Sequence, residues 1–289
     1  MSGWTAMPGR VVPGLHLVST PIGAARDITL KALDVLAGAD VLAAEDTRTL
    51  RHLMEIHGVA INGRMMLPYH DHNGAEMRPK ILGLLAEGKS VAYASEAGTP
   101  LVADPGFQLA REAIAAGHTV LAAPGASAVL CALTVSGLPS DRFLFAGFLP
   151  PKSQARKTTL RELAGVPASL IFYESPNRVA ATLADMAEVL GADRQAALCR
   201  ELTKKFEEVR RGRLADLALA LKETDVKGEI VLIVDRGAER QATQAEIEAA
   251  LRNALLTLSS KDAATAVANA FGLPRREVYQ MALALGDAE

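Results

Sequence analysis

The sequence of 289 residues lacks the features of several protein classes. It has two cysteines, Cys131 and Cys199, both in apolar stretches, so we expect two buried free thiols rather than a disulfide framework or a zinc site. Aromatic residues make up 4%, too few for extended base-stacking platforms. The net charge of −2 excludes a polybasic nucleic-acid coat but permits a local basic patch. Hydrophobic residues make up 49%, which excludes a disordered chain.

Further absences concern cofactors and membranes. The phosphate-binding patterns GxxxxGK[ST] and GxGxxG are missing, and the N-terminus has no continuous apolar core of an export signal. Residues 113–140 carry no charged side chain, but Gly117, Pro124 and Gly137 interrupt this stretch. It predicts a buried strand followed by a buried helix rather than a membrane span. We therefore expect a soluble, cytoplasmic protein with no membrane partner.

Strand-like and helix-like segments alternate in the first half. The predicted strands are residues 15–20, 41–45, 65–69, 90–95 and 119–123. The predicted helices between them are residues 28–37, 48–57, 75–87 and 107–116. This alternation predicts βαβ units and a parallel sheet. Asp27 is expected to cap the first helix, and Asp46 or Thr47 the second.

The second half predicts a mixed sheet. Its strand-like segments are residues 144–149, 169–174, 196–201, 207–212 and 229–235, and its helices are 153–164, 177–190 and 213–223. The third and fourth of these strands are too close for a crossover helix, so they predict an antiparallel hairpin.

A polar linker over residues 236–244 is followed by three predicted helices, at 244–257, 260–271 and 274–285. They are compatible with a helix-turn-helix unit, and equally with a helical bundle that has no nucleic-acid role. The chain is predicted to be α/β, with α/β domains at 13–127 and 128–237 and a helical unit at 243–286.

Ligands in open α/β sheets bind at the carboxyl ends of the strands. In this chain those ends carry small, polar or turn residues at 19–23, 45–48, 70–73, 95–106 and 124–127. Their single glycines beside Pro, Thr or Ser predict a pocket for a small neutral or zwitterionic ligand.

Two of these strand ends carry candidate proton acceptors. Glu45-Asp46-Thr47-Arg48 could simply begin a helix, with Asp46 at its positive end, but this does not explain the cluster of two acids and an arginine. His70 and His72 have the spacing of metal ligands, yet no third ligand is identifiable, so no metal is expected. An imidazole there can instead accept a proton.

Two basic runs lie in the second half. The first contains Lys152, Arg156, Lys157 and Arg161 with no acid among them, and the second contains Lys204, Lys205, Arg210, Arg211 and Arg213 against Glu207 and Glu208. Such runs usually form a solvated face, but two in one predicted domain favour contacts with phosphate.

Motifs throughout the chain carry a family resemblance. In chain order they are STPIG, AAEDTR, HDHN, SEAGTPLVADPG, GFLPPK, FYESPNR, CRELTK and GEIVLIV. Over roughly 13–285 the chain resembles the ribosomal RNA small subunit methyltransferase I family, within the tetrapyrrole-methylase-like superfamily. It departs from the family pattern at Glu96, where Asp is usual, and at Ala24, where Asn is usual.

The resemblance implies two α/β domains of tetrapyrrole-methylase type and a homodimer. It also implies S-adenosylmethionine bound between the domains, and 2′-O-methylation of a decoding-centre cytidine in 16S rRNA, as RNA or within the small ribosomal subunit. The cofactor residues that it implies are Pro21, Ile22, Gly23, Ser95, Glu96, Gly98, Thr99, Pro100, Ser127, Ala128, Phe172, Tyr173, Glu201, Leu202, Gly228, Glu229 and Ile230.

We assign the remaining candidates to the RNA side. Asp46, Glu45 and His70 are candidate proton acceptors for the ribose hydroxyl, and Arg48, Asn73 and Lys204 complete the predicted catalytic set. The predicted RNA-binding residues are Lys152, Arg156, Lys157, Arg161, Arg178 and Lys205.

Two other functions stay open from the sequence. A tetrapyrrole methyltransferase would share the fold, because fold does not fix function, but it has no obvious need for the basic runs or the helical tail. A non-catalytic module that senses the cofactor or RNA is the third interpretation. Transfer of a labelled methyl group to undermodified small subunits distinguishes it from an enzyme.

Overall fold

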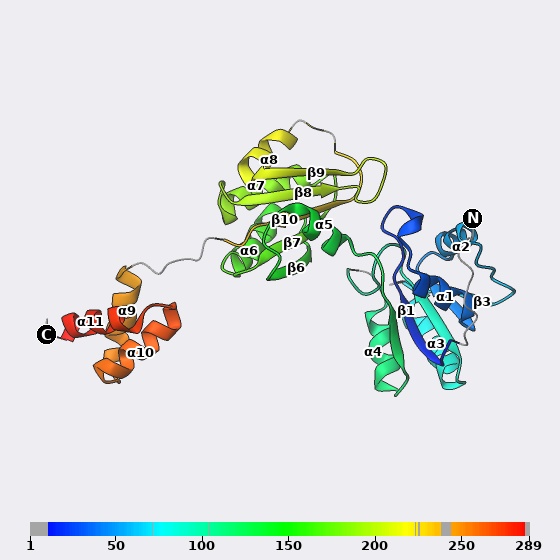
Figure 1. The fold of residues 1–289 in the computed structure, drawn as a ribbon, viewed down its shortest axis with the longest axis horizontal. Coiled ribbons are helices and arrows are strands. Elements are labelled where there is room, and N and C mark those ends of the chain that lie inside the picture. The colour runs from blue at the N-terminus through cyan, green and yellow to red at the C-terminus, as the bar shows by residue number, and fades with distance from the viewer. Residues whose placement is uncertain are drawn as a thin grey trace. The chain divides into compact units, whose positions relative to one another are not determined.

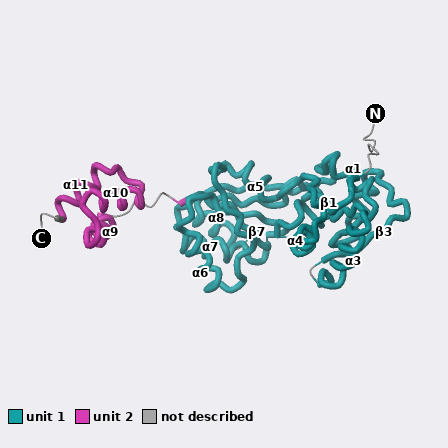
Figure 2. Tube along the Cα trace, turned by 90° about the horizontal axis from the view of Figure 1, so that it is seen from below, with its two compact units in different colours: residues 1–236 teal, residues 237–289 magenta. Residues whose placement is uncertain are grey.

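The computed structural model describes residues 11–70, 72–103, 105–222, 224, 226–237 and 244–286. The chain divides into two compact units, residues 1–236 and residues 237–289 (Figure 2). Asp71, Asp104 and most of the predicted polar linker lie outside the described residues. The predicted division of the first unit into two α/β domains near residue 127 stays a prediction.

The first sheet is wholly parallel, as predicted (Figure 1). Its strands are β1 (Gly14–Val18), β2 (Val41–Ala44), β3 (Met65–Pro68), β4 (Ser90–Ala94) and β5 (Val120–Ala123), in the order β3-β2-β4-β1-β5. All five carboxyl ends therefore meet at one edge of the sheet.

Helices cover both faces of this sheet. The first face packs against α1 (Leu30–Gly38) and α2 (Thr47–Ile56), and the second against α3 (Gly74–Ala86) and α4 (Phe107–Ala115). Buried Leu36 and Met54 fill the first interface, and Ile81, Tyr93 and Leu109 fill the second. The strands are apolar on both sides because both faces are covered.

One of the two predicted helix caps is wrong. Asp27 ends a short 3₁₀ turn (Ala25–Asp27), and the Thr29 side chain caps α1 by accepting from the Ala32 N–H at 3.2 Å. Thr29 has the extended backbone of a cap residue and directly precedes the helix, whereas Asp27 lies too early. The Asp46 cap of α2 is confirmed, since its carboxylate accepts from the Arg48 N–H at 2.7 Å.

The second sheet is mixed, as predicted. Its strands are β6 (Phe143–Phe148), β7 (Ser169–Glu174), β8 (Gln195–Arg200), β9 (Glu208–Arg213) and β10 (Ile230–Val234), in the order β6-β7-β10-β8-β9. Only β6 and β7 pair in parallel, and β8 and β9 form the predicted hairpin.

One face of the second sheet packs against α6 (Ser153–Leu163), α7 (Val179–Leu190) and α8 (Leu214–Leu221), and the other against α5 (Ala128–Ser136). The charge-free stretch thus forms β5 and α5. The prediction that its strand is buried is wrong, because β5 lies at the sheet edge and Leu121 is 40% exposed. No helix in the described ranges is long and apolar enough to cross a membrane.

The second unit is a three-helix unit, as predicted. It contains α9 (Gln244–Leu255), α10 (Ser260–Phe271) and α11 (Arg275–Gly286) around a core with Leu251, Val267 and Val278. Gly272 ends α10 with φ 64°, a conformation that suits glycine, and Leu273-Pro274 leads into α11.

Candidate functional site

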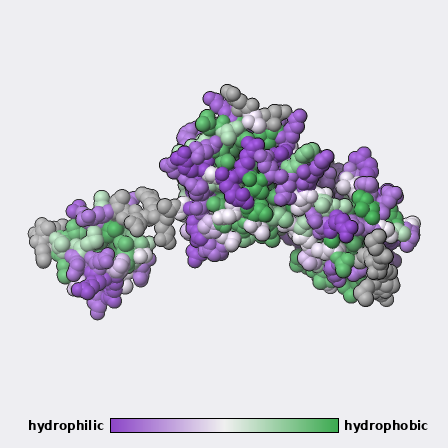
Figure 3. Space-filling view, turned by 45° about the horizontal axis from the view of Figure 1, so that its top comes forward, coloured by the Kyte–Doolittle hydropathy of each residue, from purple (hydrophilic) through white to green (hydrophobic). Residues whose placement is uncertain are grey.

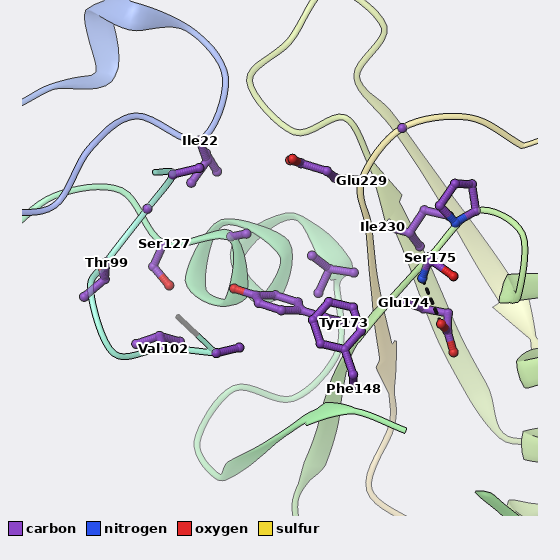
Figure 4. Close-up of a pocket in the computed structure, with 17 residues that line it drawn as sticks. Ile22, Thr99, Val102, Ser127, Phe148, Tyr173, Glu174, Ser175, Glu229 and Ile230 are labelled. Atoms are coloured by element: carbon purple, nitrogen blue, oxygen red, sulfur yellow. Dashed lines mark hydrogen bonds between the residues drawn. The ribbon is translucent and has the colours of Figure 1, made fainter. Parts of the chain in front are cut away.

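A cavity of about 380 Å³ lies at the carboxyl edge of the first sheet, against the second sheet. Residues that follow β1, β4 and β5 form one wall, and residues at the ends of β6 and β7 and the start of β10 form the other (Figure 4). The volume and the largely apolar lining are typical of a small-molecule site. The lining residues are Ile22, Ala97, Gly98, Thr99, Val102, Ala103, Ser127, Ala128, Phe148, Tyr173, Glu174, Ser175, Pro176, Gly228, Glu229, Ile230 and Val231.

The first wall is held by hydrogen bonds between loops. Thr20 and Gly98 exchange backbone hydrogen bonds of 2.9 and 3.1 Å, and the Thr99 hydroxyl donates to the Ala126 carbonyl at 3.0 Å. Gly98 has φ +83°, and a Cβ there would lie 3.2 Å from Ile22 Cγ2. The loop after β4 therefore presents backbone closely to the cavity, as glycine alone permits.

The second wall is aromatic. The rings of Tyr173 and Phe148 meet edge to face with centroids 5.6 Å apart, and both line the cavity (Figure 4). Phe172 is fully buried in the core under α6, α7 and α8, because adjacent strand residues face opposite sides. The expectation that Phe172 encloses the cofactor is therefore wrong if the cofactor occupies this cavity, whereas Tyr173 lines the cavity.

A buried carboxylate holds this wall in place. Glu174 accepts from the Ser175 N–H at 2.8 Å and from the Thr182 hydroxyl at 2.6 Å, with Arg178 Nε 3.3 Å away. Arg178 also donates to the carbonyls of Leu149 and Pro150, at 2.6 and 3.2 Å. These bonds tie the end of β6 to the end of β7, where the two aromatic rings lie.

The turn between β8 and β9 connects the two walls. The Lys204 ammonium donates at 3.0 Å to Glu201 and at 3.0 Å to Glu229, and Glu201 also accepts from the Glu229 N–H. That backbone hydrogen bond lowers the pKa of Glu201. Burial would lower the pKa of Lys204, but its hydrogen bonds to Glu201 and Glu229 outweigh burial and raise it. Lys204 therefore joins Glu201 of the turn to Glu229 at the start of β10.

The loop after β1 packs tightly on the same turn. The Ala24 N–H donates to the Thr203 hydroxyl at 3.1 Å, and a Cβ at Gly23 would lie 2.5 Å from that oxygen. Glu201 and Thr203 have φ of 51° and 62°, so the turn adopts a conformation that non-glycine residues rarely take. Loop and turn together fix the position of Ile22 in the cavity.

The charge of the cavity selects against phosphates. Its described lining contains Glu174 and Glu229 but no Lys, Arg or His. Glu174 is buried and bonded to Ser175, Thr182 and Arg178, so Glu229 is the carboxylate that a ligand can meet, and it disfavours an anionic ligand. Apolar rings, backbone cradles at Gly98 and Gly228, and one exposed carboxylate therefore fit S-adenosylmethionine, whose sulfonium is cationic.

The candidate proton acceptors lie farther along the same sheet edge. β2 and β3 pair with Ala44 opposite Pro68, so Asp46 and His70 each follow two residues later at adjacent strand ends. Hydrogen bonds from the Arg48 side chain lower the pKa of Asp46 to about 2. The backbone N–H of His70 donates to Asn73 Oδ1 at 2.8 Å, and its buried Nδ1 has no hydrogen-bond partner among the residues that the structure describes. Asn73 thus shapes the loop, donating in turn to the Pro68 carbonyl.

The cavity gathers some of the predicted cofactor residues but not others. Those that line it are Ile22, Gly98, Thr99, Ser127, Ala128, Tyr173, Gly228, Glu229 and Ile230. Those outside its lining are Pro21, Gly23, Ser95, Glu96, Pro100, Phe172, Glu201 and Leu202. Two of these residues support lining residues through hydrogen bonds. Buried Ser95 donates to the Gly98 carbonyl, and the Glu201 carboxylate accepts from the Glu229 N–H.

Other lining residues were missed. They are Ala97, Val102, Ala103, Phe148, Glu174, Ser175, Pro176 and Val231. Glu174, Ser175 and Pro176 directly follow Tyr173 at the end of β7, so the rule that ligands bind at strand ends could have found them. Phe148 ends a strand on the far wall, and only the pairing of β6 with β7 brings it to the site.

The predicted RNA-binding residues divide by exposure. Lys152, Arg161 and Lys205 are exposed. Arg156 is only 3% exposed and pairs with Asp185 at 2.6 Å, so its assignment as an RNA contact is wrong. It was misassigned because it lies in a basic run, yet the helical repeat turns it inward between α6 and α7. Arg178 is engaged by Glu174 and two carbonyls, and Lys157 pairs with Glu188 at 2.5 Å.

No group of three or more His, Cys, Asp or Glu side chains suited to a metal occurs among the residues that the structure describes. His70 and His72 are described, with ring centroids 6.0 Å apart, but Asp71 between them is not.

Comparison with known proteins agrees with this architecture. Residues 14–218 match the family model described as tetrapyrrole (corrin/porphyrin) methylases, and residues 241–286 match an RsmI C-terminal HTH domain. The ribosomal RNA small subunit methyltransferase I of Mesorhizobium japonicum is 47% identical over 99% of this chain and 97% of its own. The chain belongs to the ribosomal RNA small subunit methyltransferase I family of tetrapyrrole methylases.

Other members of this family are also similar over nearly the whole chain. The Vibrio cholerae protein of the same name is 43% identical over 94% of this chain and 94% of its own. Among solved structures, a uroporphyrin-III C-methyltransferase from Thermus thermophilus in complex with S-adenosylhomocysteine is 19% identical, with a TM-score of 0.54 over 78% of this chain and 97% of its own. A diphthine synthase has a TM-score of 0.60 at 19% identity, over 76% and 89% of the two chains. The family is one of methyltransferases, in agreement with the predicted donor, S-adenosylmethionine.

Proposed function

We propose that this protein transfers a methyl group from S-adenosylmethionine to the ribose 2′-hydroxyl of a decoding-centre cytidine in 16S rRNA. The observation that carries the proposal is 47% identity, over nearly full length, with a protein named ribosomal RNA small subunit methyltransferase I. A cavity with no cationic side chain in its described lining supports the choice of cofactor. A ribosomal RNA substrate supports a cytoplasmic location.

We assign the cofactor to the cavity. The apolar faces of Ile22, Tyr173 and Phe148 suit the adenine ring, and the hydroxyls of Thr99 and Ser127 can hydrogen-bond polar groups. Glu229, bonded to Lys204, adds a carboxylate oxygen at the opposite wall. When bound, S-adenosylmethionine supplies an electrophilic methyl group. The protein must then align the ribose hydroxyl with that group and accept its proton.

We assign proton acceptance to the strand ends of β2 and β3. β2 lies beside β4, whose loop lines the cavity, and β3 lies beyond β2, so the acceptor ribose would occupy the same sheet edge. A carboxylate with a pKa of about 2 is a weak base, which argues against Asp46. The buried Nδ1, which no described residue hydrogen-bonds, favours His70 as the acceptor. Asp46 then serves to hold Arg48, whose side chain is 89% exposed and can contact phosphate. Glu45 lies next to this pair in the chain.

The RNA face would include the exposed cations Arg48, Lys152, Arg161 and Lys205. Lys204, which two carboxylates hold, would shape the site rather than bind phosphate. For the homodimer, the supporting observation is edge strand β5, which exposes Leu121 within a stretch that has no charged residue. Sheet edges without charges are ready to associate with another chain.

The test uses labelled S-adenosylmethionine and small subunits from a strain that lacks the orthologous gene. We expect label in 16S rRNA, and nucleoside mass spectrometry should identify 2′-O-methylcytidine. Label in a base instead of a ribose would refute the ribose assignment. Methylation of a porphyrinoid but not of RNA would replace the proposal with the tetrapyrrole alternative.

A further inference from the structure

A second cavity, of about 220 Å³, lies beside the β8–β9 edge of the second sheet. Leu198, Leu221 and Val226 form its apolar part. Its described charged lining consists of Arg200, Arg210 and Lys227, with Glu208 as the one acid. The cofactor cavity has the opposite character, since its described charged lining is entirely acidic.

The hairpin register brings the arginines together. Arg200 pairs with Glu208 across the strands, and Leu198 pairs with Arg210, so these side chains share one face of the sheet. Glu208 accepts from Arg200 Nε at 3.0 Å and from Arg210 Nε at 2.6 Å. The hydrogen bond from Arg210, followed by that from Arg200, lowers the pKa of Glu208. One ionised carboxylate therefore orients two guanidinium groups.

Both guanidinium groups keep donors for a ligand. Arg210 donates only through Nε within the described part of the chain, which leaves both of its Nη groups. Arg200 uses Nη1 on the Lys227 carbonyl at 3.1 Å. Guanidinium groups bind phosphate oxygens in pairs, and the apolar part of the cavity can cover a sugar or base face.

The two cavities lie on either side of the same short segments. Lys227 lines the second cavity and the next residue, Gly228, lines the cofactor cavity. Arg200 likewise precedes Glu201, whose carboxylate accepts from the Glu229 N–H. Figure 3 turns the side that bears α8, β8 and β9 forward and shows strongly hydrophilic residues gathered there beside apolar ones.

We propose that the cavity formed around Arg200 and Arg210 binds a backbone phosphate of the RNA strand. The proposal rests on the proposed function, because it assumes that RNA is the substrate. It adds a phosphate site that the basic runs of the sequence do not define, since Arg200 and Lys227 lie outside both runs.

The test measures binding of an unmodified 16S rRNA transcript over a range of salt concentrations. Each lost phosphate contact with a single strand reduces the slope of log K against log salt by about 0.7, which is about fivefold in affinity at ~0.1 M salt. We expect Arg210→Ala to show both effects and Arg210→Lys to keep most of the slope. Glu208→Gln should tighten binding by up to about fivefold, because it removes the charge that competes with phosphate.

The matched controls are Arg236→Ala and Asp141→Asn, which make the same changes of net charge at an exposed ion pair elsewhere. Cofactor affinity and melting temperature report whether each variant folds. If the pocket variants behave as the controls do, the phosphate site is refuted while methylation by the wild type keeps the proposed function. If the wild type neither binds nor methylates RNA, both proposals fall.

Discussion

Substitution of Gly23 by alanine tests whether the β8–β9 turn positions the cofactor loop. The added Cβ would lie 2.5 Å from Thr203 Oγ1, 2.6 Å from Lys204 Cγ and 2.9 Å from the Leu202 carbonyl oxygen. Contacts this short force a movement. The turn is held by the bonds among Lys204, Glu201 and Glu229, so the loop that carries Ile22 should move instead.

Overpacking of this kind costs about 1–3 kcal/mol. If the cost falls on the bound state, the dissociation constant for S-adenosylmethionine rises about 5- to 150-fold. Titration calorimetry measures this, with a melting curve to show that the variant folds. Gly165→Ala is the matched control, since its Cβ meets nothing within 4 Å. A folded Gly23→Ala protein with wild-type affinity would show that the turn does not position the loop.

Three further predictions concern charge and burial. Arg156→Ala should destabilise the protein by about 3–5 kcal/mol in denaturant unfolding, because it leaves Asp185 buried without its partner. The control Arg161→Ala, at an exposed position, should have little effect on stability. Equal stabilities of the two variants would refute the structural role of the Arg156–Asp185 pair. Asp46→Asn should lower the melting temperature at neutral pH. Because the folded-state pKa of Asp46 is lowered from 3.8 to about 2, the difference in melting temperature between variant and wild type should shrink as the pH falls through this window. A difference that does not depend on pH would contradict the ion pair with Arg48. If His70 accepts the proton, His70→Ala should cut turnover by at least about a hundredfold with cofactor affinity unchanged. Turnover at the wild-type rate in this variant would exclude His70 as the base.

The sequence predicted the sheets better than the side-chain contacts. Alternating apolar strands and amphipathic helices predict βαβ units, and the short gap after Arg200 predicts the hairpin, because both depend on local spacing. The order of the strands does not depend on local spacing. β4 lies between β2 and β1 because of pairing between residues far apart in the chain. That order decides which loops meet, so Phe148 could not be placed at the site from the sequence.

The burial of single side chains shows most clearly what the sequence does not reveal. Cys199 lies in an apolar stretch and Arg156 in a basic run, yet both are buried, and burial raises the pKa of the Cys199 thiol to about 11. A run of cations predicts a phosphate surface only if each side chain faces solvent. Helix periodicity turns Arg156 inward to Asp185 while Lys152 stays exposed.

The same reasoning explains how one domain can serve two ligands of opposite charge. Neighbouring residues of one short segment face different cavities: Lys227 lies in a cationic one, and Gly228 and Glu229 line an acidic one. Under the two proposals the cofactor is a cation and RNA is a polyanion, so each cavity would disfavour the other's ligand. Lys204 holds Glu229 and Arg178 holds Glu174, so these two cations would act on cofactor binding through the wall of its cavity. Replacement of Lys204 or Arg178 by a neutral residue should therefore weaken cofactor binding more than RNA binding. For Lys204 this is the opposite of what its place in a basic run suggests.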